Sequence, residues 1–353
     1  MTGILRLPPR LRFRGVVGTG GIGSGSFFLL DGNETLGREE SRSGRFLDRR
    51  DYCKLHIISH YVKVLLGEAC SVHAIGRVGD DDDGRRLCSE MGAAGIDLGL
   101  VHVIPDAPTL FSFCLVYPDG AGGNLSTADS ASSRVDAAAI REAAPLAREL
   151  GAEGIALAVP EVPLAARREL LDAATACGMF RAASFTNAEM EEVRSSGLLE
   201  RVDLCALNLE EAAAAAGIRD GRSGGEPDVI ARSAVKELST AYPRLQLSIT
   251  AGKTGSWCWD GNSLGFDPAI RVEAAGTSGA GDAHFSGILA GIAAGLELRE
   301  AHELGTMAAA ASVTSPHTIH PALTADLLRS VARRRGRVCE RAAALLDTAN
   351  GGS

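Results

Sequence analysis

The chain of 353 residues carries 36 Lys and Arg against 44 Asp and Glu, a net charge of -8 at pH 7, and 45% of its residues are hydrophobic. This composition is typical of a globular protein with a sizeable core. The acidic balance disfavours binding to nucleic acid or to anionic membranes, and no stretch approaches the ~18 apolar residues of a membrane span. The eight cysteines are scattered without a CxxC pair, which favours reduced thiols. We therefore expect a cytoplasmic protein that binds small molecules.

Short β-like runs alternate along the chain with helix-forming segments. Such alternation is typical of a parallel sheet that helices cover on both faces. The sequence therefore predicts an α/β fold with a doubly wound, mostly parallel sheet. The β-like runs are residues 15–18, 71–76, 155–159, 204–207 and 247–250, and the helical patterns lie near 55–66, 84–94, 136–150, 163–177, 228–241 and 283–295.

A second kind of β signal lies outside this alternation. The run FSFCLVY at residues 111–117 is bracketed by prolines, and SFFLLDG at 26–32 has a similar composition. We expect the two runs to form a small antiparallel β lid, spanning about 22–36 and 105–128. The apolar face of this lid is expected to cover a substrate or to meet a second subunit, which would make a homodimer.

The run from Gly18 to Gly23, GTGGIG, follows a predicted strand and matches the GxGxxG spacing of a dinucleotide-binding fingerprint. That fingerprint requires a helix to begin at its third glycine. Residues 24–26 lead instead into a β-like run that starts at Phe27. The sequence therefore disfavours a nicotinamide cofactor.

Residues 276–295, GTSGAGDAHFSGILAGIAAG, place three glycines ahead of one acid, Asp282, and continue as an apolar helical pattern. Apolar residues recur at i, i+3, i+4 and i+7 from Phe285, so we expect a helix to begin near Ala280. The free N–H groups and the positive dipole end of such a helix form an anion site. A capping aspartate would stand before the first turn, whereas Asp282 lies inside it, which favours a functional role.

With three further motifs in the expected order, this stretch resembles the ribokinase, or PfkB, family of carbohydrate kinases. The resemblance spans roughly residues 70–320 and implies a ribokinase-like kinase domain over 1–335, with a helix end and tail over 336–353. The acidic run inside the first motif is expected to be a solvated loop that leads into a helix. The motifs are G-x-V-G-D-D-x-x-G at 76–84, N-x-x-E at 208–211, T-x-G-x-x-G at 250–255 and T-x-G-A-G-D at 277–282.

The resemblance implies a kinase that moves the γ-phosphate of ATP to a hydroxyl of a sugar or sugar-like molecule. Asp282 would accept the proton of that hydroxyl. The backbone of Gly279, Ala280 and Gly281 would hold the transferring phosphoryl group. Phosphoryl transfer depends chiefly on such positioning and on electrostatic stabilisation of the γ-phosphoryl oxygens.

The same resemblance implies a nucleotide and metal site. Asn208 and Glu211 would organise Mg²⁺ through water, because this ion gives up its hydration reluctantly. A helix cap with an early-turn carboxylate is an equally good interpretation of that motif by itself. The residues expected to line the nucleotide are Thr250, Gly252, Gly255 and Thr277, with Thr306 beside the base.

The chain departs from the family where the sugar hydroxyls are held. Family members usually carry an acid just after the first strand and Gly-Gly plus Asn on the next helix, whereas this chain has Gly23 and the segment 50–67, RDYCKLHIISHYVKVLLG. A nucleoside kinase of the same fold and a ligand-binding protein without turnover therefore stay open as alternatives. In the charged loop 37–51, we hypothesise that one of four arginines reaches an anionic or strongly polar substrate, against the alternative of a solvated loop: Arg42, Arg45, Arg49 or Arg50.

Overall fold

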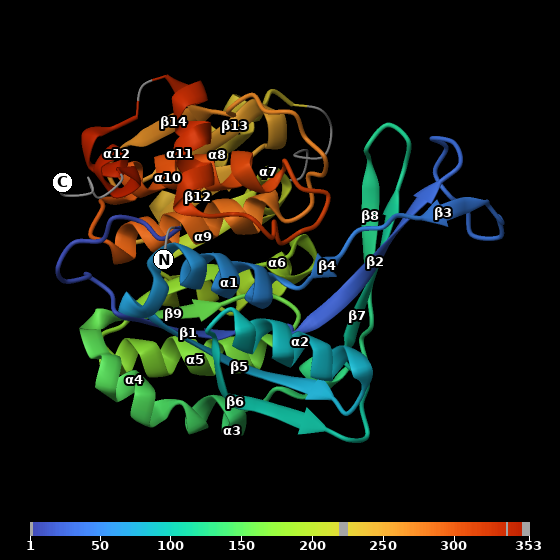
Figure 1. The fold of residues 1–353 in the computed structure, drawn as a ribbon, viewed down its shortest axis with the longest axis horizontal. Helices are drawn as coiled ribbons and strands as arrows, with labels where there is room; N and C mark the ends of the chain where they lie inside the picture. Colours follow the sequence, from blue (N-terminus) through green and yellow to red (C-terminus); the bar gives the residue numbers. More distant parts are fainter. Residues whose placement is uncertain (1–2, 219–224, 337, 348–353) are drawn as a thin grey trace, which may run out of the picture.

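A nine-stranded sheet forms the centre of the molecule (Figure 1). The structure is a computed structural model that describes residues 3–218, 225–336 and 338–347. The strands of this sheet are β1 Gly15–Thr19, β5 Ser71–Gly79, β6 Asp97–Ile104, β9 Gly154–Ala158, β10 Phe180–Ser184, β11 Leu204–Asn208, β12 Gln246–Thr250, β13 Gly255–Trp259 and β14 Leu264–Pro268. Their order is β14-β13-β12-β11-β10-β9-β1-β5-β6, and only β13 and β14 run antiparallel to their neighbours.

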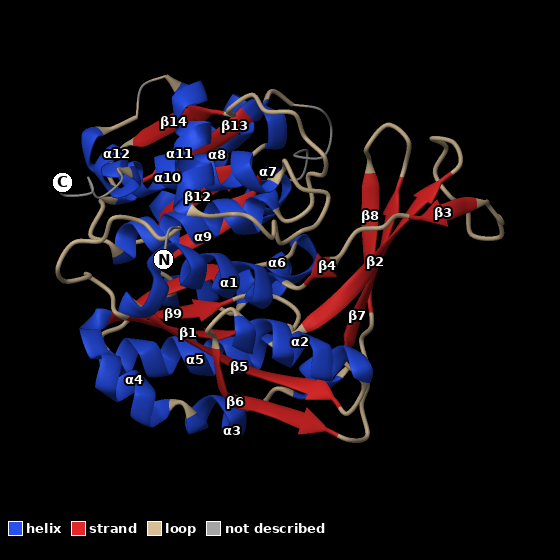
Figure 2. Cartoon of the chain, in the orientation of Figure 1, coloured by secondary structure: helices blue, strands red, loops and turns tan. Residues whose placement is uncertain are grey.

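Helices cover both faces of the sheet (Figure 2). Successive strand residues point to opposite faces: Val16 packs into one hydrophobic cluster and Val17 into another, and Leu204 and Cys205 divide in the same way. This explains why the predicted strands are continuously apolar. The helices are α1 Lys54–Leu66, α2 Asp82–Ala93, α3 Ala137–Glu142, α4 Ala144–Leu150, α5 Leu164–Cys177, α6 Met190–Ser195, α7 Leu209–Ala215, α8 Pro227–Ala241, α9 Ala280–Ala293, α10 Leu298–Ser312, α11 Ala325–Arg335 and α12 Glu340–Leu346.

The chain order of the strands reverses between β1 and β9. From β1 the chain moves outward through β5 to β6, and it then returns to build β9 to β14 on the other side. Ligands of open α/β sheets bind beyond the carboxyl ends of the strands at such a reversal. The segments that follow β1 and β9 meet there, where Gly21 N–H donates to Pro160 O at 3.0 Å.

A separate β lid projects from this edge of the sheet (Figure 1). Its strands are β2 Gly23–Leu30, β3 Gly44–Phe46, β4 Asp51–Tyr52, β7 Leu110–Val116 and β8 Gly122–Ser126. The lid order is β3-β2-β7-β8, and β4 also pairs with β2.

The predicted fold class is confirmed, and the lid differs from the prediction in one respect. Strands β2 and β7 pair in parallel, whereas β2 with β3 and β4, and β7 with β8, pair antiparallel. An all-antiparallel lid was wrong because β2 and β7 both leave the same edge of the main sheet, from β1 and from β6, and so run in the same direction. The charged loop 37–51 also contributes β3 and part of β4 to the lid.

Near its carboxyl end the chain continues the core. Helix α12 buries Ala342, Leu345 and Leu346 in the same hydrophobic cluster as α9 and α10, so the described part of 336–353 packs on the same core. Residues 348–353 of the expected tail lie outside the described residues. Among the described helices, none is long and apolar enough to cross a membrane.

Candidate active site

Asp282 lies in the first turn of α9, where the sequence places it. Helix α9 begins at Ala280, and its N-cap residue Gly279 has a φ of 78°, a left-handed conformation that glycine adopts without strain. The N–H groups of a first helical turn have no partner inside the helix. Ala280 N–H donates to Thr277 O at 3.3 Å, which leaves the N–H groups of Gly281 and Asp282 beside one carboxylate in the opening turn of α9.

Lys54, the first residue of α1, lies against this carboxylate. Its Nζ is 3.1 Å from Asp282 Oδ1. The attraction of Asp282 raises the pKa of Lys54 far enough that the ammonium stays charged at any physiological pH, although burial opposes this shift. The fixed ion pair joins α1 to α9 at the centre of the site.

Two cavities meet at this ion pair. The larger has a volume of about 920 Å³ and lies under the lid, and the smaller, of about 230 Å³, lies over the ends of β11 and β12. Four residues line both cavities: Lys54, Thr277, Gly279 and Asp282. A group held in one cavity can therefore meet a group held in the other beside Lys54 and Asp282.

The smaller cavity brings together several residues that the motifs predicted. It is lined by Asn208, Glu211, Thr250, Ala280 and Gly281. A Cβ on Gly281 would lie 3.9 Å from Thr250 Oγ1, so the threonine faces the opening turn of α9. The carboxyl edge of the sheet thus assembles motifs that lie up to 75 residues apart, as parallel strands require.

Asn208 and Glu211 form a capping box on α7. Asn208 Oδ1 accepts from Glu211 N–H at 2.8 Å, and Glu211 Oε2 accepts from Asn208 N–H at 2.8 Å. Burial raises the pKa of Glu211. The cap uses only Oε2 of Glu211, a residue that lines the cavity, and one carboxylate with one amide suits Mg²⁺ held largely by water and phosphate. Within the described ranges, no cluster of three His, Cys, Asp or Glu side chains could hold a metal.

Three residues that were predicted to contact the nucleotide line neither of these two cavities. Gly252 and Gly255 bound the tight turn between β12 and β13, and a Cβ on Gly255 would lie 2.2 Å from Asp267 O. Thr306 is buried in α10, where its hydroxyl donates to His302 O at 3.0 Å. Each of these positions has a structural reason for its residue.

Two carboxylates face the larger cavity beside Asp282. Glu161 follows β9 and is the one non-glycine residue with a positive φ, 76°, among those that the structure describes. Its Oε2 is buried without a hydrogen bond in the described part of the chain, and burial raises the pKa of Glu161 to about 7. Asp51 of β4 lines the same cavity, and burial raises its pKa too. Strain and unsatisfied buried groups of this kind concentrate at functional sites.

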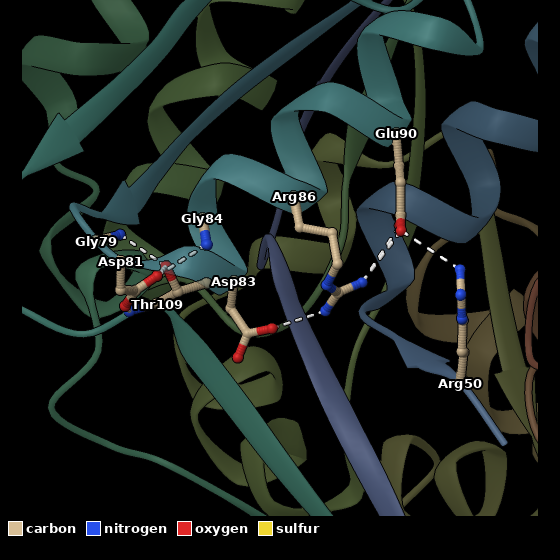
Figure 3. A network of polar contacts seen from close by, with 8 residues as sticks. All are labelled: Arg50, Gly79, Asp81, Asp83, Gly84, Arg86, Glu90 and Thr109. Atoms are coloured by element: carbon tan, nitrogen blue, oxygen red, sulfur yellow. Dashed lines mark hydrogen bonds and ion pairs between the residues drawn. The ribbon is translucent and has the colours of Figure 1, made fainter. Parts of the chain in front are cut away.

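The four arginines of the charged loop divide into two pairs. Arg45 and Arg49 line the larger cavity and have no ion pair among the described residues. Arg42 forms an ion pair with Glu40. The backbone N–H of Arg50 donates to His317 Nδ1, and the side chain of Arg50 forms an ion pair with Glu90. Figure 3 shows Arg50 reaching Glu90 on α2.

The acidic run after β5 has a structural role. Asp81 is the N-cap of α2, where its Oδ1 accepts from Gly84 N–H at 2.8 Å, and its Oδ2 accepts from Thr109 N–H at 2.7 Å (Figure 3). The expected loop is confirmed at Asp80 and Asp81, whereas Asp82 and Asp83 already belong to the first turn of α2. The cap also fastens the start of β7 to α2.

Sequence reasoning did not assign roles to Lys54, Asp51 and Glu161. Lys54 is one of only four lysines in the chain and stands immediately before a predicted helix, which is the one signal that could have found it. Asp51 lay inside a segment read as a charged loop. Glu161 comes two residues after the predicted strand 155–159, but nothing in the sequence reveals its backbone strain.

The sheet reversal, the projecting lid and the aspartate at a helix start between two cavities define a ribokinase-like kinase architecture. A model of the pfkB family of carbohydrate kinases matches residues 58–325, and the chain belongs to this family. It is 40% identical over 63 residues to an uncharacterised sugar kinase of Escherichia coli (strain K12), YegV, a match that covers 18% of this chain and 20% of that protein.

Solved structures share the fold. A Burkholderia thailandensis nucleoside kinase in complex with inosine superposes with a TM-score of 0.70 at 18% identity, covering 92% of this chain and 99% of that one. Arabidopsis thaliana ribokinase complexed with ribose and ATP gives 0.69 at 16% identity, with coverage of 92% and 99%. Solved structures of this fold thus include a ribokinase and a nucleoside kinase, and the fold alone does not separate their substrates.

Proposed function

We propose that the protein transfers the γ-phosphate of ATP to a hydroxyl of a sugar or sugar-like small molecule. The acceptor O–H bond breaks and its proton passes to a carboxylate oxygen of Asp282. The acceptor oxygen bonds to the γ-phosphorus as the bond to the β,γ-bridging oxygen breaks, and that electron pair leaves with ADP. The backbone of Gly279 to Gly281 stabilises the charge on the phosphoryl oxygens.

One observation carries this proposal: Asp282 and the opening turn of α9 border both cavities. A nucleotide over Asn208 and Thr250 and an acceptor under the lid would then meet at the same carboxylate. Asn208 and Glu211 would hold Mg²⁺ through water, and the ion would neutralise phosphate charge there. Gly252, Gly255, Thr277 and Thr306 remain proposals as nucleotide contacts.

The lining of the larger cavity favours a polyhydroxylated acceptor. Carboxylates accept hydrogen bonds from hydroxyl groups, and Glu161 supplies a buried one. Arg45 and Arg49, without ion pairs among the described residues, add a preference for an acceptor that also carries an anionic group. The volume of about 920 Å³ also admits a nucleoside, so a nucleoside kinase is the second candidate.

The test is ADP production from Mg·ATP with D-ribose, D-fructose, D-gluconate and adenosine, in the wild type and in Asp282→Asn. We expect turnover with at least one acceptor, and a loss of at least about 1000-fold in kcat in Asp282→Asn with nucleotide binding retained. The control is Asp129→Asn, which removes an exposed carboxylate that lines neither cavity.

Each outcome has a clear meaning. Turnover that Asp282→Asn retains would reject the proposed base. Nucleotide binding without turnover on any acceptor would favour a ligand-binding protein that keeps the fold. A lower KM for D-gluconate than for the neutral sugars would support the role of Arg45 and Arg49, and a preference for adenosine would favour the nucleoside kinase.

We also propose that the lid joins two copies of the chain. Its cavity face carries Phe27 and Cys114, whereas the opposite face carries an aromatic cluster in which the ring centres of Phe28 and Phe46 lie 5.1 Å apart. The side chain of Phe46 is 65% exposed and that of Leu125 is 63% exposed. Contiguous exposed apolar surface of this kind supports a protein interface.

A further inference from the structure

Asp51 reaches the acceptor cavity from an unexpected strand. It lies on β4, where it pairs with Gly25 of β2, and Gly25 pairs on its other side with Ser112 of β7. The segment is held in place from the main domain, because Tyr52 N–H donates to Thr318 Oγ1 at 3.0 Å and Thr318 N–H donates to Arg50 O at 3.1 Å. Asp51 is therefore fixed at the base of the lid, beside the sheet edge.

The carboxylate of Asp51 lies across Gly25. A Cβ on Gly25 would stand 2.6 Å from Asp51 Oδ2 and 3.0 Å from Asp51 Cβ, so the aspartate fills the volume that a side chain at 25 would take. Glu161 uses Gly21 in the same way, since a Cβ there would lie 2.5 Å from Glu161 Cβ and 2.7 Å from its Oε2. Two glycines at the beginning of the lid thus make room for two carboxylates.

The electrostatic surroundings of Asp51 leave its charge uncompensated. Among the described residues no cation pairs with it, and the hydrogen bond to Oδ2 at 3.3 Å comes from the thiol of Cys114, a weak donor. Burial is the main reason that the pKa of Asp51 is raised, the hydrogen bond from Cys114 lowers it, and the nearby Asp282 raises it further. A carboxylate can accept about four hydrogen bonds, so Asp51 keeps unused acceptor capacity toward the cavity that it lines.

We infer that Asp51 is a specificity-determining residue that binds an acceptor hydroxyl group other than the one phosphorylated. The inference rests on the proposed phosphotransfer and deepens it, because it requires an acceptor with at least two hydroxyl groups. A neutral hydroxyl donates to the carboxylate and replaces the weak thiol contact. Asp51 lines only the acceptor cavity and not the smaller one, so its contribution falls on the acceptor and not on the nucleotide.

The experiment compares the wild type with Asp51→Asn and Asp51→Ala on the best acceptor of the panel and on its monodeoxy analogues, such as 2-deoxy-D-ribose for D-ribose. Asp48→Asn is the control, because Asp48 is exposed, lies three residues earlier and lines neither cavity. Both Asp51 variants should raise the acceptor KM by about 10- to 100-fold, the loss expected for a hydrogen bond to a charged group. The KM for ATP should stay within about twofold.

The deoxy analogues separate recognition from structural damage. The wild type should discriminate against the one analogue that lacks the hydroxyl bound by Asp51, and the Asp51 variants should lose that discrimination, as coupled contacts require. An acceptor KM within twofold of the wild type in Asp51→Asn, or discrimination that Asp51→Ala retains, would overturn the assignment while leaving the proposed function intact. Absence of wild-type turnover on every acceptor would instead reject the proposed function. Calorimetric titration of the panel into Mg·ADP-loaded wild type and Asp51→Asn then decides about Asp51, since equal binding or no binding overturns its role.

Discussion

The contact between Lys54 and Asp282 is the feature of single residues that most directly concerns catalysis. An ammonium 3.1 Å from the proposed base fixes the direction of one carboxylate oxygen and leaves the other for the acceptor hydroxyl. Positioning of this kind accounts for much of the rate of phosphoryl transfer. Asp282, Glu211 and Glu161 all raise the pKa of Lys54 by attraction, so this one ammonium interacts with three neighbouring carboxyl groups.

Lys54→Met should therefore lower kcat by about 100-fold, because it removes a charge-assisted contact from the reacting group. Lys54→Arg should recover at least part of the loss, since a cation remains. Steady-state kinetics of both variants, with the acceptor that the panel identifies, measure these values of kcat. Lys236→Met, which removes an exposed ammonium from α8, should leave kcat unchanged. A Lys54→Met protein with wild-type kcat would show that the ion pair has no catalytic consequence.

The two faces of the lid differ in role, because successive side chains along each strand point to opposite faces. Residues on β2 and β7 that point inward line the cavity, and their neighbours point outward into the Phe28, Phe46 and Phe113 cluster. Alternation in strands makes this division unavoidable. The glycine run 18–23 leads from β1 into the first residue of β2, and its Gly21 makes room for the side chain of Glu161.

If the outer face of the lid joins two copies, Phe46→Glu should weaken the dimer by at least about 30-fold in dissociation constant, the loss typical of a buried aromatic residue at an interface. Sedimentation velocity over a range of protein concentrations gives this value. Val229→Glu places the same charge on an equally exposed apolar residue of α8, whose exposure is 60%, and should not change association. A wild-type protein that stays monomeric at all concentrations would contradict the proposed lid interface.

For the molecule as a whole, Glu161 ties stability to pH. Its pKa is raised to about 7 from an ordinary 4.5, so between these values the folded protein holds a proton that the unfolded chain has released. The contribution of Glu161 to the free energy of unfolding is fully present below pH 4.5 and is lost as the pH rises through 7. The shift corresponds to a difference of about 3 kcal/mol in the free energy of unfolding.

Urea unfolding of the wild type and Glu161→Gln at pH 5, 6, 7 and 8 measures this effect. The wild type should lose stability relative to the variant as the pH rises, with most of the change between pH 5 and pH 7. Glu191→Gln, which alters an exposed glutamate of α6, should follow the wild type at every pH. A difference between wild type and Glu161→Gln that is the same at pH 5 and pH 8 would contradict the raised pKa.

The alternation of β-like and helical segments was sufficient to predict the doubly wound sheet, because both signals depend on short-range patterns of apolar residues. It was also sufficient to place Asp282 in the first turn of α9, since the helix begins where the period of 3.6 begins. Strands β6, β10, β13 and β14 gave no such signal, because polar residues or glycines interrupt their apolar runs.

The acceptor side could not be predicted in the same way. The resemblance led to a search for an acid directly after the first strand, at Gly23, whereas the folded chain brings Asp51 and Lys54 to the cavity from β4 and the start of α1. Whether a side chain such as Asp51 fills the space beside a glycine depends on the pairing of strands that lie more than 25 residues apart in the sequence. The sequence by itself determined the class of sheet, five of its nine strands and the motifs at the carboxyl edge, because these rest on short local patterns. Only the tertiary structure decided which charges meet at that edge, because that depends on contacts between distant segments.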